Sequence, residues 1–172
     1  MKTKTKLSQS NIIIIYAIIL IALFFTASVC SCGKKEPPAQ PEPGAIMKKI
    51  SERLQAQFPA GAPVYENASI DPEIYSNDKN KPADLSKIEK YSIIKAGGNP
   101  DIEIAVFKLY DKVNAEYVKE MARTRILNIQ ADCVSEISNG SEVRSYGNYV
   151  YYVSHPQKDK VFEIIEDMLR GA

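Results

Sequence analysis

The sequence has few of the side chains that most often carry chemistry in proteins. It contains one histidine, His155, and three cysteines, Cys30, Cys32 and Cys133. A structural zinc site needs several cysteine and histidine ligands, and a hydrolytic triad needs a nucleophile held beside a base and an orienting acid. His155 directly precedes Pro156 at a predicted strand-to-helix junction, and no Gly-x-Ser-x-Gly turn accompanies it. We therefore expect no catalytic residues, no metal site and no cofactor.

The chain also lacks an excess of charge of either sign. It has 22 basic and 21 acidic residues, which gives a formal net charge of +1. Nucleic-acid-binding domains carry a basic patch or stripe, because they neutralise phosphates. We expect no nucleic-acid partner.

Charge is absent altogether from the run Ile12–Phe25, which follows Lys2, Lys4 and Lys6. This order of a basic segment and an apolar segment is typical of an export signal. When the run is extended to Val29 it reaches 18 residues, near the lower limit of about 17 residues for a helix that spans a bilayer. An uncleaved membrane anchor is therefore the alternative, and both interpretations leave the lysines in the cytoplasm and the rest of the chain outside it.

The segment Val29-Cys30-Ser31-Cys32 ends the apolar run and resembles the lipobox of bacterial lipoproteins. In that family an aliphatic residue lies three positions before the modified cysteine and a small residue lies directly before it. Cys32 has Val29 and Ser31 in these places, whereas Cys30 is preceded by the branched Val29. The resemblance implies that Cys32 carries a diacylglyceryl thioether and becomes the mature N-terminus. Two acyl chains hold a protein on a bilayer, so the resemblance implies a lipid-anchored protein that faces outside the cytoplasm, with the bilayer as a partner.

These features divide the chain into three parts. Residues 1–31 are predicted to be a signal peptide. Residues 32–44 are predicted to be the lipidated N-terminus and a disordered tether, because they are rich in proline and have no bulky apolar side chain. Residues 45–172 are long enough to form a single α+β domain with a core of its own.

The periodicity of apolar residues predicts the elements of this domain. Residues 46–58 have helical spacing, and residues 59–82 contain turn signals throughout, which predicts a long surface connection. Two pairs of β-prone runs, at 91–110 and 142–154, are each joined by a glycine-containing turn and followed by an amphipathic helix, the first of which is expected to continue to about residue 137. The run 101–110 is apolar on both sides, which is typical of an interior strand. The order predicts a four-stranded, largely antiparallel sheet made of two β-hairpins, with amphipathic helices packed on one face.

The second half of the chain carries a further resemblance. The segments "DIEIAVFKLYD" and "GNYVYYVSHPQKDKVFEIIEDML" are similar to a domain of unknown function in small lipoproteins of Gram-positive anaerobes, over about residues 91–169. The shared motifs resemble strand and turn requirements, so the resemblance implies kinship without implying a reaction.

The segment between Asp78 and Glu89 has oxygen-bearing side chains at several spacings of a calcium-binding loop. Pro82 has no side-chain oxygen where one is needed, and Ala83 replaces the glycine of the sharp bend. We interpret this segment as a helix-capping loop.

Tyrosines crowd the last hairpin. Tyr149 and Tyr151 must share one face of a strand, and Tyr152 faces the other way. Exposed tyrosines would form a surface for a cell-envelope protein or glycan, and Tyr149, Tyr151 and Tyr152 are the candidate contact residues. The alternative is that these rings pack across the strands or under the helices.

The expected function is a non-catalytic binding or scaffolding domain, and the oligomeric state is not indicated. The alternative is an enzyme, or an accessory subunit of an envelope enzyme or transporter, with a site assembled from dispersed residues. A pocket of polar side chains around His155 would favour the alternative, whereas an exposed aromatic patch would favour binding.

Overall fold

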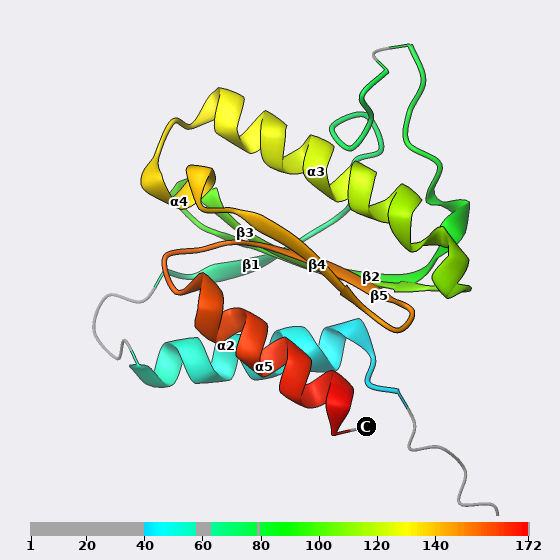
Figure 1. Ribbon diagram of the computed structural model, residues 1–172. Helices are drawn as coiled ribbons and strands as arrows, with labels where there is room; N and C mark the ends of the chain where they lie inside the picture. The colour runs from blue at the N-terminus through cyan, green and yellow to red at the C-terminus, as the bar shows by residue number, and fades with distance from the viewer. Residues whose placement is uncertain (1–39, 58–62, 79, 172) are drawn as a thin grey trace, which may run out of the picture. The chain divides into compact units, whose positions relative to one another are not determined.

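The computed structural model describes residues 40–57, 63–78 and 80–171. The described part contains a mixed arrangement of helices and strands, so the α+β class is confirmed (Figure 1). Its elements in chain order are α2 (Pro43–Gln57), β1 (Tyr65–Ala68), η1 (Leu85–Lys87), β2 (Ile88–Ala96), β3 (Asn99–Leu109), η2 (Lys112–Asn114), α3 (Ala115–Asp132), α4 (Glu136–Asn139), β4 (Glu142–Tyr146), β5 (Tyr149–Ser154) and α5 (Lys158–Arg170).

The strands form one antiparallel sheet in the order β1-β2-β3-β5-β4. Both predicted hairpins are present, because β2 pairs with β3 and β4 pairs with β5. Their turns place Gly98 and Gly147 at φ of 78° and 58°, backbone conformations that glycine adopts readily because it has no Cβ.

The prediction of four strands is wrong, because β1 adds a fifth. This strand lies in the stretch that the turn signals assigned to a surface connection. It is four residues long, and it pairs with the outer edge of β2 from Tyr65 opposite Ala96 to Ala68 opposite Ile93. A strand of four residues is too short to show an alternating pattern in the sequence. It is extended because it pairs with β2.

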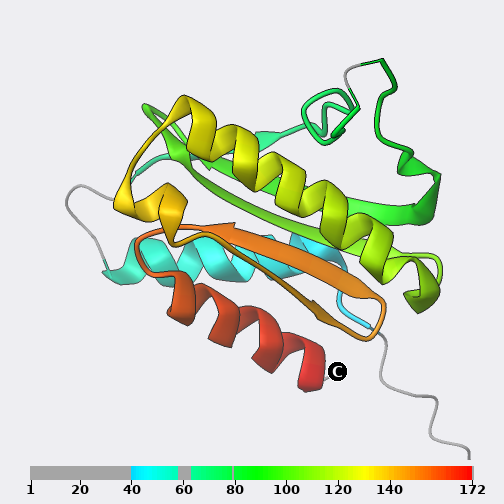
Figure 2. The ribbon, with the colours of Figure 1, turned by 45° about the horizontal axis from the view of Figure 1, so that its top comes forward.

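The prediction that the helices share one face is also wrong. Helices α2 and α5 cover one face of the sheet, and α3 covers the other (Figures 1 and 2). The reason is visible in β3, where Ile104 and Val106 face one layer while Ala105 and Phe107 face the other. A strand that is apolar on both sides needs cover on both sides.

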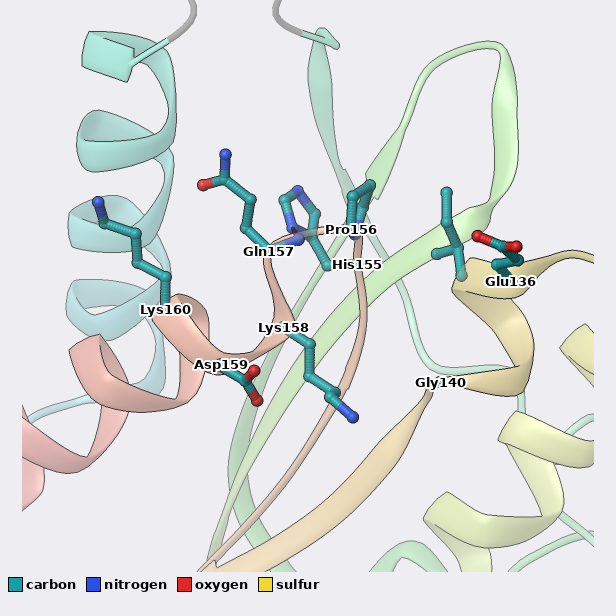
Figure 3. A pocket seen from close by; sticks show the side chains of 9 residues that line it. Glu136, Gly140, His155, Pro156, Gln157, Lys158, Asp159 and Lys160 are labelled. Carbon is teal, nitrogen blue, oxygen red and sulfur yellow. Dashed lines mark hydrogen bonds between the residues drawn. The ribbon is translucent and has the colours of Figure 1, made fainter.

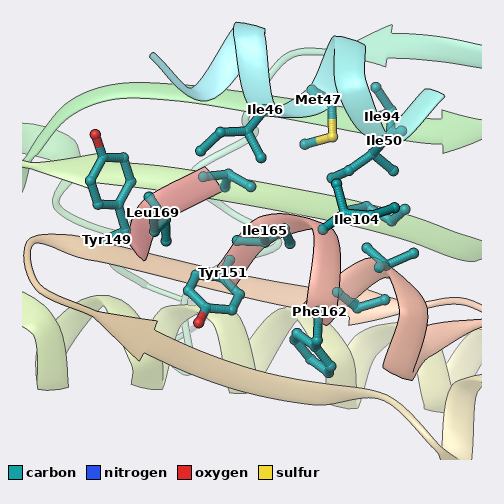
Figure 4. Close-up of a cluster of buried hydrophobic side chains, with 14 of the residues drawn as sticks. Ile46, Met47, Ile50, Ile94, Ile104, Tyr149, Tyr151, Phe162, Ile165 and Leu169 are labelled. Carbon is teal, nitrogen blue, oxygen red and sulfur yellow. The ribbon is translucent and has the colours of Figure 1, made fainter. Parts of the chain in front are cut away.

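The layer between the sheet and helices α2 and α5 is almost entirely apolar (Figure 4). Ring packing within it includes Tyr151 against Phe162, with centroids 5.9 Å apart. Its buried members are Ile46, Met47, Ile50, Leu54, Ile94, Ile104, Val106, Tyr149, Tyr151, Val153, Val161, Phe162, Ile164, Ile165 and Leu169.

The layer under α3 is a second core. It also receives Tyr75, which comes from the long connection between β1 and η1 and packs edge-on against Phe107. Its buried members are Tyr75, Ile88, Ile93, Ala105, Phe107, Leu109, Val118, Met121, Ala122, Ile126, Val150 and Tyr152.

The folded part begins earlier than residue 45. Helix α2 starts at Pro43, a residue that fits the first turn of a helix because it needs no amide donor there. The Glu42 carboxylate lies 2.9 Å from the Lys90 ammonium and 3.4 Å from that of Lys108, and the Tyr149 hydroxyl donates to the Pro41 carbonyl at 2.7 Å. Residues 40–44 therefore belong to the compact unit instead of to a disordered tether.

The helix expected to continue to about residue 137 is divided into two. Helix α3 ends at Asp132, and Ser135 starts α4 with a capping box in which Ser135 and Ser138 satisfy each other's backbone amides. Among residues 40–57, 63–78 and 80–171, no helix is both long and apolar enough to cross a membrane.

Candidate functional site

The three candidate contact tyrosines are core residues. Tyr149, Tyr151 and Tyr152 are 2%, 1% and 0% exposed. As the strand period requires, Tyr149 and Tyr151 lie in the α2/α5 layer and Tyr152 lies under α3. Their interpretation as an exposed contact surface does not agree with this burial, because a ring enclosed by helices cannot stack on a ligand. The three rings instead pack under the helices, as the alternative interpretation stated.

The cysteine predicted to be lipidated lies outside the described residues. Cys32, the predicted lipidation site, precedes residue 40, so its modification stays a prediction. Cys133 is a half-buried free thiol that ends α3, where its amide donates to the Ile129 carbonyl.

A hollow of about 590 Å³ lies at the end of the sheet where β5 passes into α5 (Figure 3). Residues of the β5–α5 connection, the first turn of α5, and α4 surround it. The lining residues are Glu136, Ile137, Gly140, His155, Pro156, Gln157, Lys158, Asp159 and Lys160.

The local sequence explains why β5 ends and α5 begins beside the hollow. Pro156 follows the last strand residues and cannot donate to a sheet ladder, so the strand stops. Helix α5 then starts at Lys158, and Gln157 makes no capping hydrogen bond through its side chain. The first turn of α5 therefore presents its positive dipole end to the hollow without a side-chain cap.

His155 forms the floor of the hollow and is held at both ring nitrogens. Its Nδ1 accepts from the Gln157 amide at 2.9 Å, and its Nε2 lies 2.8 Å from the Tyr65 hydroxyl. Because Nδ1 accepts a hydrogen bond, the proton of the neutral ring is on Nε2 and is donated to Tyr65. Burial lowers the pKa of His155 to about 4, so the ring is neutral at neutral pH and its acceptor nitrogen is already occupied.

The rim of the hollow carries charges of both signs. Lys158 and Lys160 lie on the first turn of α5, Asp159 lies between them, and Glu136 faces them from α4. The Lys158 ammonium is 3.6 Å from the Glu142 carboxylate. Such a rim can hold a polar molecule through hydrogen bonds and charge, and its lining lacks a side chain that His155 could activate as a nucleophile.

A second polar cluster is sealed beneath α3. The carboxylate of Glu103 on β3 accepts two hydrogen bonds from Arg125 on α3, at 3.0 and 2.6 Å. It also accepts from the hydroxyl of Tyr152 and lies 3.5 Å from that of Tyr75 and 3.3 Å from the Lys95 ammonium. Burial favours the neutral acid, but the hydrogen bonds and charge of Arg125 outweigh it and hold the pKa of Glu103 below its usual value. Since Glu103 is 1% exposed, the cluster is a structural network without access for a ligand.

The Asp78–Glu89 segment behaves as a capping loop. Asp84 accepts from the Ser86 amide at 2.9 Å and so caps η1, and Asp78 accepts from the Asn80 amide at 2.9 Å. Within the described residues, no group of three or more histidine, cysteine, aspartate or glutamate side chains is placed to hold a metal ion.

Sequence reasoning placed His155 at a strand-to-helix junction but missed Tyr65, which contacts its ring, and Glu136, which lines the hollow. The Tyr65 hydroxyl is 90 positions away along the chain, and Glu136 comes from α4. The available signal was local: a histidine and a proline with two lysines within the next four residues, "HPQKDK". Only the topology brings β1 and α4 to the same place.

A scan against protein-family models found no match, and searches of curated proteins and of solved structures found no similar chain. The two family resemblances drawn from the sequence therefore stay predictions.

Proposed function

We propose that the chain is a bacterial lipoprotein whose folded part is held on the outer face of the cell membrane by acylated Cys32. In this proposal the folded part is a non-catalytic binding or scaffolding domain, and the hollow around His155 is its contact site. The basic and apolar N-terminal segments and the lipobox-like segment 29–32 support the anchor.

The observation that carries the proposal is the position of the hollow relative to the start of the folded part. The Pro41 carbonyl accepts a hydrogen bond from the hydroxyl of Tyr149, the first residue of β5. The hollow begins at His155, directly after the last residue of β5 (Figure 3). A strand of six residues spans about 20 Å, and this distance separates the hollow from the point where the chain enters the folded part.

The state of His155 supports binding over catalysis. A general base must offer a free nitrogen with a pKa near the operating pH. His155 has an occupied Nδ1 and a pKa of about 4, so it shapes the hollow instead of moving protons. The lysines of the rim suit carboxylate or phosphate groups, and Glu136 and Asp159 suit hydroxyl or amino groups. These are the groups that cell-envelope proteins and glycans display.

The anchor is tested by labelling cells with a radioactive or clickable fatty acid. We expect Cys32→Ala to abolish labelling and to leave unprocessed precursor, because it removes the sulfur that is acylated. Cys30→Ser is the matched control and should leave labelling and processing unchanged. Mass spectrometry of the purified membrane form provides the direct measurement, and an N-terminus at Met1 without acyl mass contradicts the proposal.

The binding role is tested by reversing one rim charge. Purified lipidated protein in vesicles is incubated with cell-wall fragments and, separately, with a detergent extract of envelope proteins. We expect Lys160→Glu to weaken capture by about tenfold, because a reversed rim charge repels the group that the native charge attracts. Lys49→Glu, an exposed lysine on α2, is the control. Equal capture by wild type and both variants would remove the hollow as the contact site.

An accessory subunit of an envelope enzyme or transporter is the second candidate, and the polar hollow beside His155 is the observation that favours it. It predicts that His155→Gln leaves the folded protein bound to its partner and reduces the partner's activity. The binding proposal predicts no change in such an activity.

A further inference from the structure

Three large apolar side chains are exposed at the end of the sheet opposite the hollow. Tyr110 and Val113 lie in the connection from β3 to α3 and are 69% and 77% exposed. Tyr146 lies at the end of β4 and is 43% exposed. Apolar side chains of this size that gather at one end of a domain mark a surface that meets another molecule or a membrane.

These side chains form one surface, because the segments that carry them are hydrogen-bonded to each other. The Leu109 amide donates to the carbonyl of Asn148 in the β4–β5 turn, and the Asn148 side-chain amide donates back to the Leu109 carbonyl. The amide of Tyr110 donates to the Lys87 carbonyl at 3.3 Å, which adds η1 to the same surface. We name the surface formed by Lys87, Tyr110, Lys112, Val113 and Tyr146 the basal surface.

Among the described residues, neither Lys87 nor Lys112 of the basal surface forms a salt bridge with a carboxylate. Of the nearby acids, Glu89 pairs with Lys108, and Asp111 accepts from the Val113 amide. The pKa of Asp84 is lowered by its hydrogen bonds with Ser86 and, less strongly, by the charge of the nearby Lys87. Tyrosine and lysine are the residues that membrane proteins place at the level of the lipid headgroups.

The chain enters the folded part at this same end. The Pro41 carbonyl is hydrogen-bonded to the Tyr149 hydroxyl, and Glu42 forms a salt bridge with Lys108 near the end of β3. Only seven residues lie between Cys32 and Gln40, and the eight residue-to-residue steps reach at most about 29 Å when fully extended. The hollow lies about 20 Å further away, at the other end of β5. The basal surface is therefore the end of the domain nearest to a lipid on Cys32 and lies within reach of the bilayer.

We propose that the basal surface rests on the bilayer, with Tyr110, Val113 and Tyr146 in the headgroup region and Lys87 and Lys112 against lipid phosphates. This inference rests on the proposed lipid anchor and adds a second attachment through the folded part itself. The contact orients the domain, so that the hollow around His155 faces away from the membrane.

The test uses tryptophan as a depth probe, because the native chain contains none. Val113→Trp places the probe on the basal surface, and Val134→Trp places it between α3 and α4 at the opposite end. The two valines are a matched pair, since both are exposed residues in connections next to α3, at 77% and 86%. Each full-length lipidated variant is reconstituted in vesicles of phosphatidylethanolamine and phosphatidylglycerol with lipids brominated in the upper acyl chain.

We expect bromine to quench the probe at position 113 at least about twofold more than the probe at 134, with emission at shorter wavelength, because an interfacial side chain leaves bulk water. Dissolved acrylamide should give the reverse order. Tyr110→Trp is a second probe of the same surface, and thermal melts by circular dichroism identify any variant that does not fold.

Two failures are distinguishable. If the protein floats with the vesicles and carries acyl mass but both probes are quenched equally, the domain hangs free and only the basal contact is wrong. Strong quenching of both probes means that the domain lies on its side, which also overturns the orientation. If the protein neither floats nor carries acyl mass, the lipid anchor and the inference that rests on it fail together.

Discussion

The two faces of the sheet differ in what their helices bury. The face under α2 and α5 is filled with aliphatic side chains and the rings of Tyr149, Tyr151 and Phe162. The face under α3 encloses an ionised carboxylate, Glu103, with its guanidinium partner Arg125. One sheet therefore has an apolar layer, stabilised by removal of surface from water, and a layer whose stability also depends on a satisfied polar network.

The difference shows why the polar network is the more fragile layer. An aliphatic core loses contacts in proportion to the atoms removed. A buried ion pair loses far more when one partner is removed, because the other charge stays buried without compensation. Tyr152 and Tyr75 supply hydroxyls to Glu103, so the network joins β3, β5, α3 and the long connection after β1.

The largest effect is expected from breaking this pair. Arg125→Leu should lower the free energy of unfolding by about 3–5 kcal/mol, because it leaves Glu103 buried without its main partner. Arg123→Leu is the control on the same helix, where the arginine pairs with Glu120 at the surface, and it should cost no more than about 1 kcal/mol. Urea unfolding of the two variants gives both values, and equal losses would mean that α3 does not bury an ion pair.

The second largest effect is the pH dependence of stability, which differs between the two faces of the sheet. His155 is the titratable ring at the edge of the α2/α5 face, where it contacts Tyr65, and Lys158 and Asp159 are the charged groups nearest to it along the chain. Its pKa is lowered to about 4 in the folded state, from about 6.5 in the unfolded chain. The unfolded state then binds more protons between these values, so stability is fully present above pH 6.5 and falls as the pH drops toward 4, by up to about 1.4 kcal/mol per pH unit.

The measurement is urea unfolding at pH 7, 6, 5 and 4.5. His155→Gln should flatten this part of the profile, since glutamine does not titrate. Glu103, whose pKa lies below its usual value, should destabilise the α3 face only at lower pH, as the carboxylate becomes protonated. A variant profile as steep as that of wild type would show that another group titrates in this window.

The sequence allowed prediction of features that depend on neighbours along the chain. Both hairpins, the two glycine turns and the stripe of the last helix are local patterns, and they were predicted. The apolar residues on both sides of β3 were also recognised, but their consequence, a helix layer on each face, was not drawn.

Features that depend on distant parts of the chain escaped prediction. Arg125 and Glu103 are 22 positions apart, and Tyr65 and His155 are 90 positions apart. Neither pair leaves a periodic signal, because the fold alone brings its members together. The tyrosines of β5 were ambiguous for a similar reason: alternation assigns them to faces, but it does not say whether a helix covers each face.

The smallest effect is expected from removing one hydroxyl on each face of the sheet, by Tyr→Phe substitutions at the adjacent residues 151 and 152. Tyr152→Phe removes a hydroxyl that donates to Glu103 inside the polar network, and it should cost about 1–3 kcal/mol, because a buried carboxylate loses a donor. Tyr151→Phe removes a hydroxyl at the edge of the apolar layer, where burial and the nearby Glu166 carboxylate raise the pKa of the phenol to about 12, and it should cost about 0.5 kcal/mol. The ring packing of both residues is preserved, so the difference in urea midpoint reports the hydroxyl alone. Equal costs would show that the network under α3 contributes no more to stability than the apolar layer beneath α2 and α5.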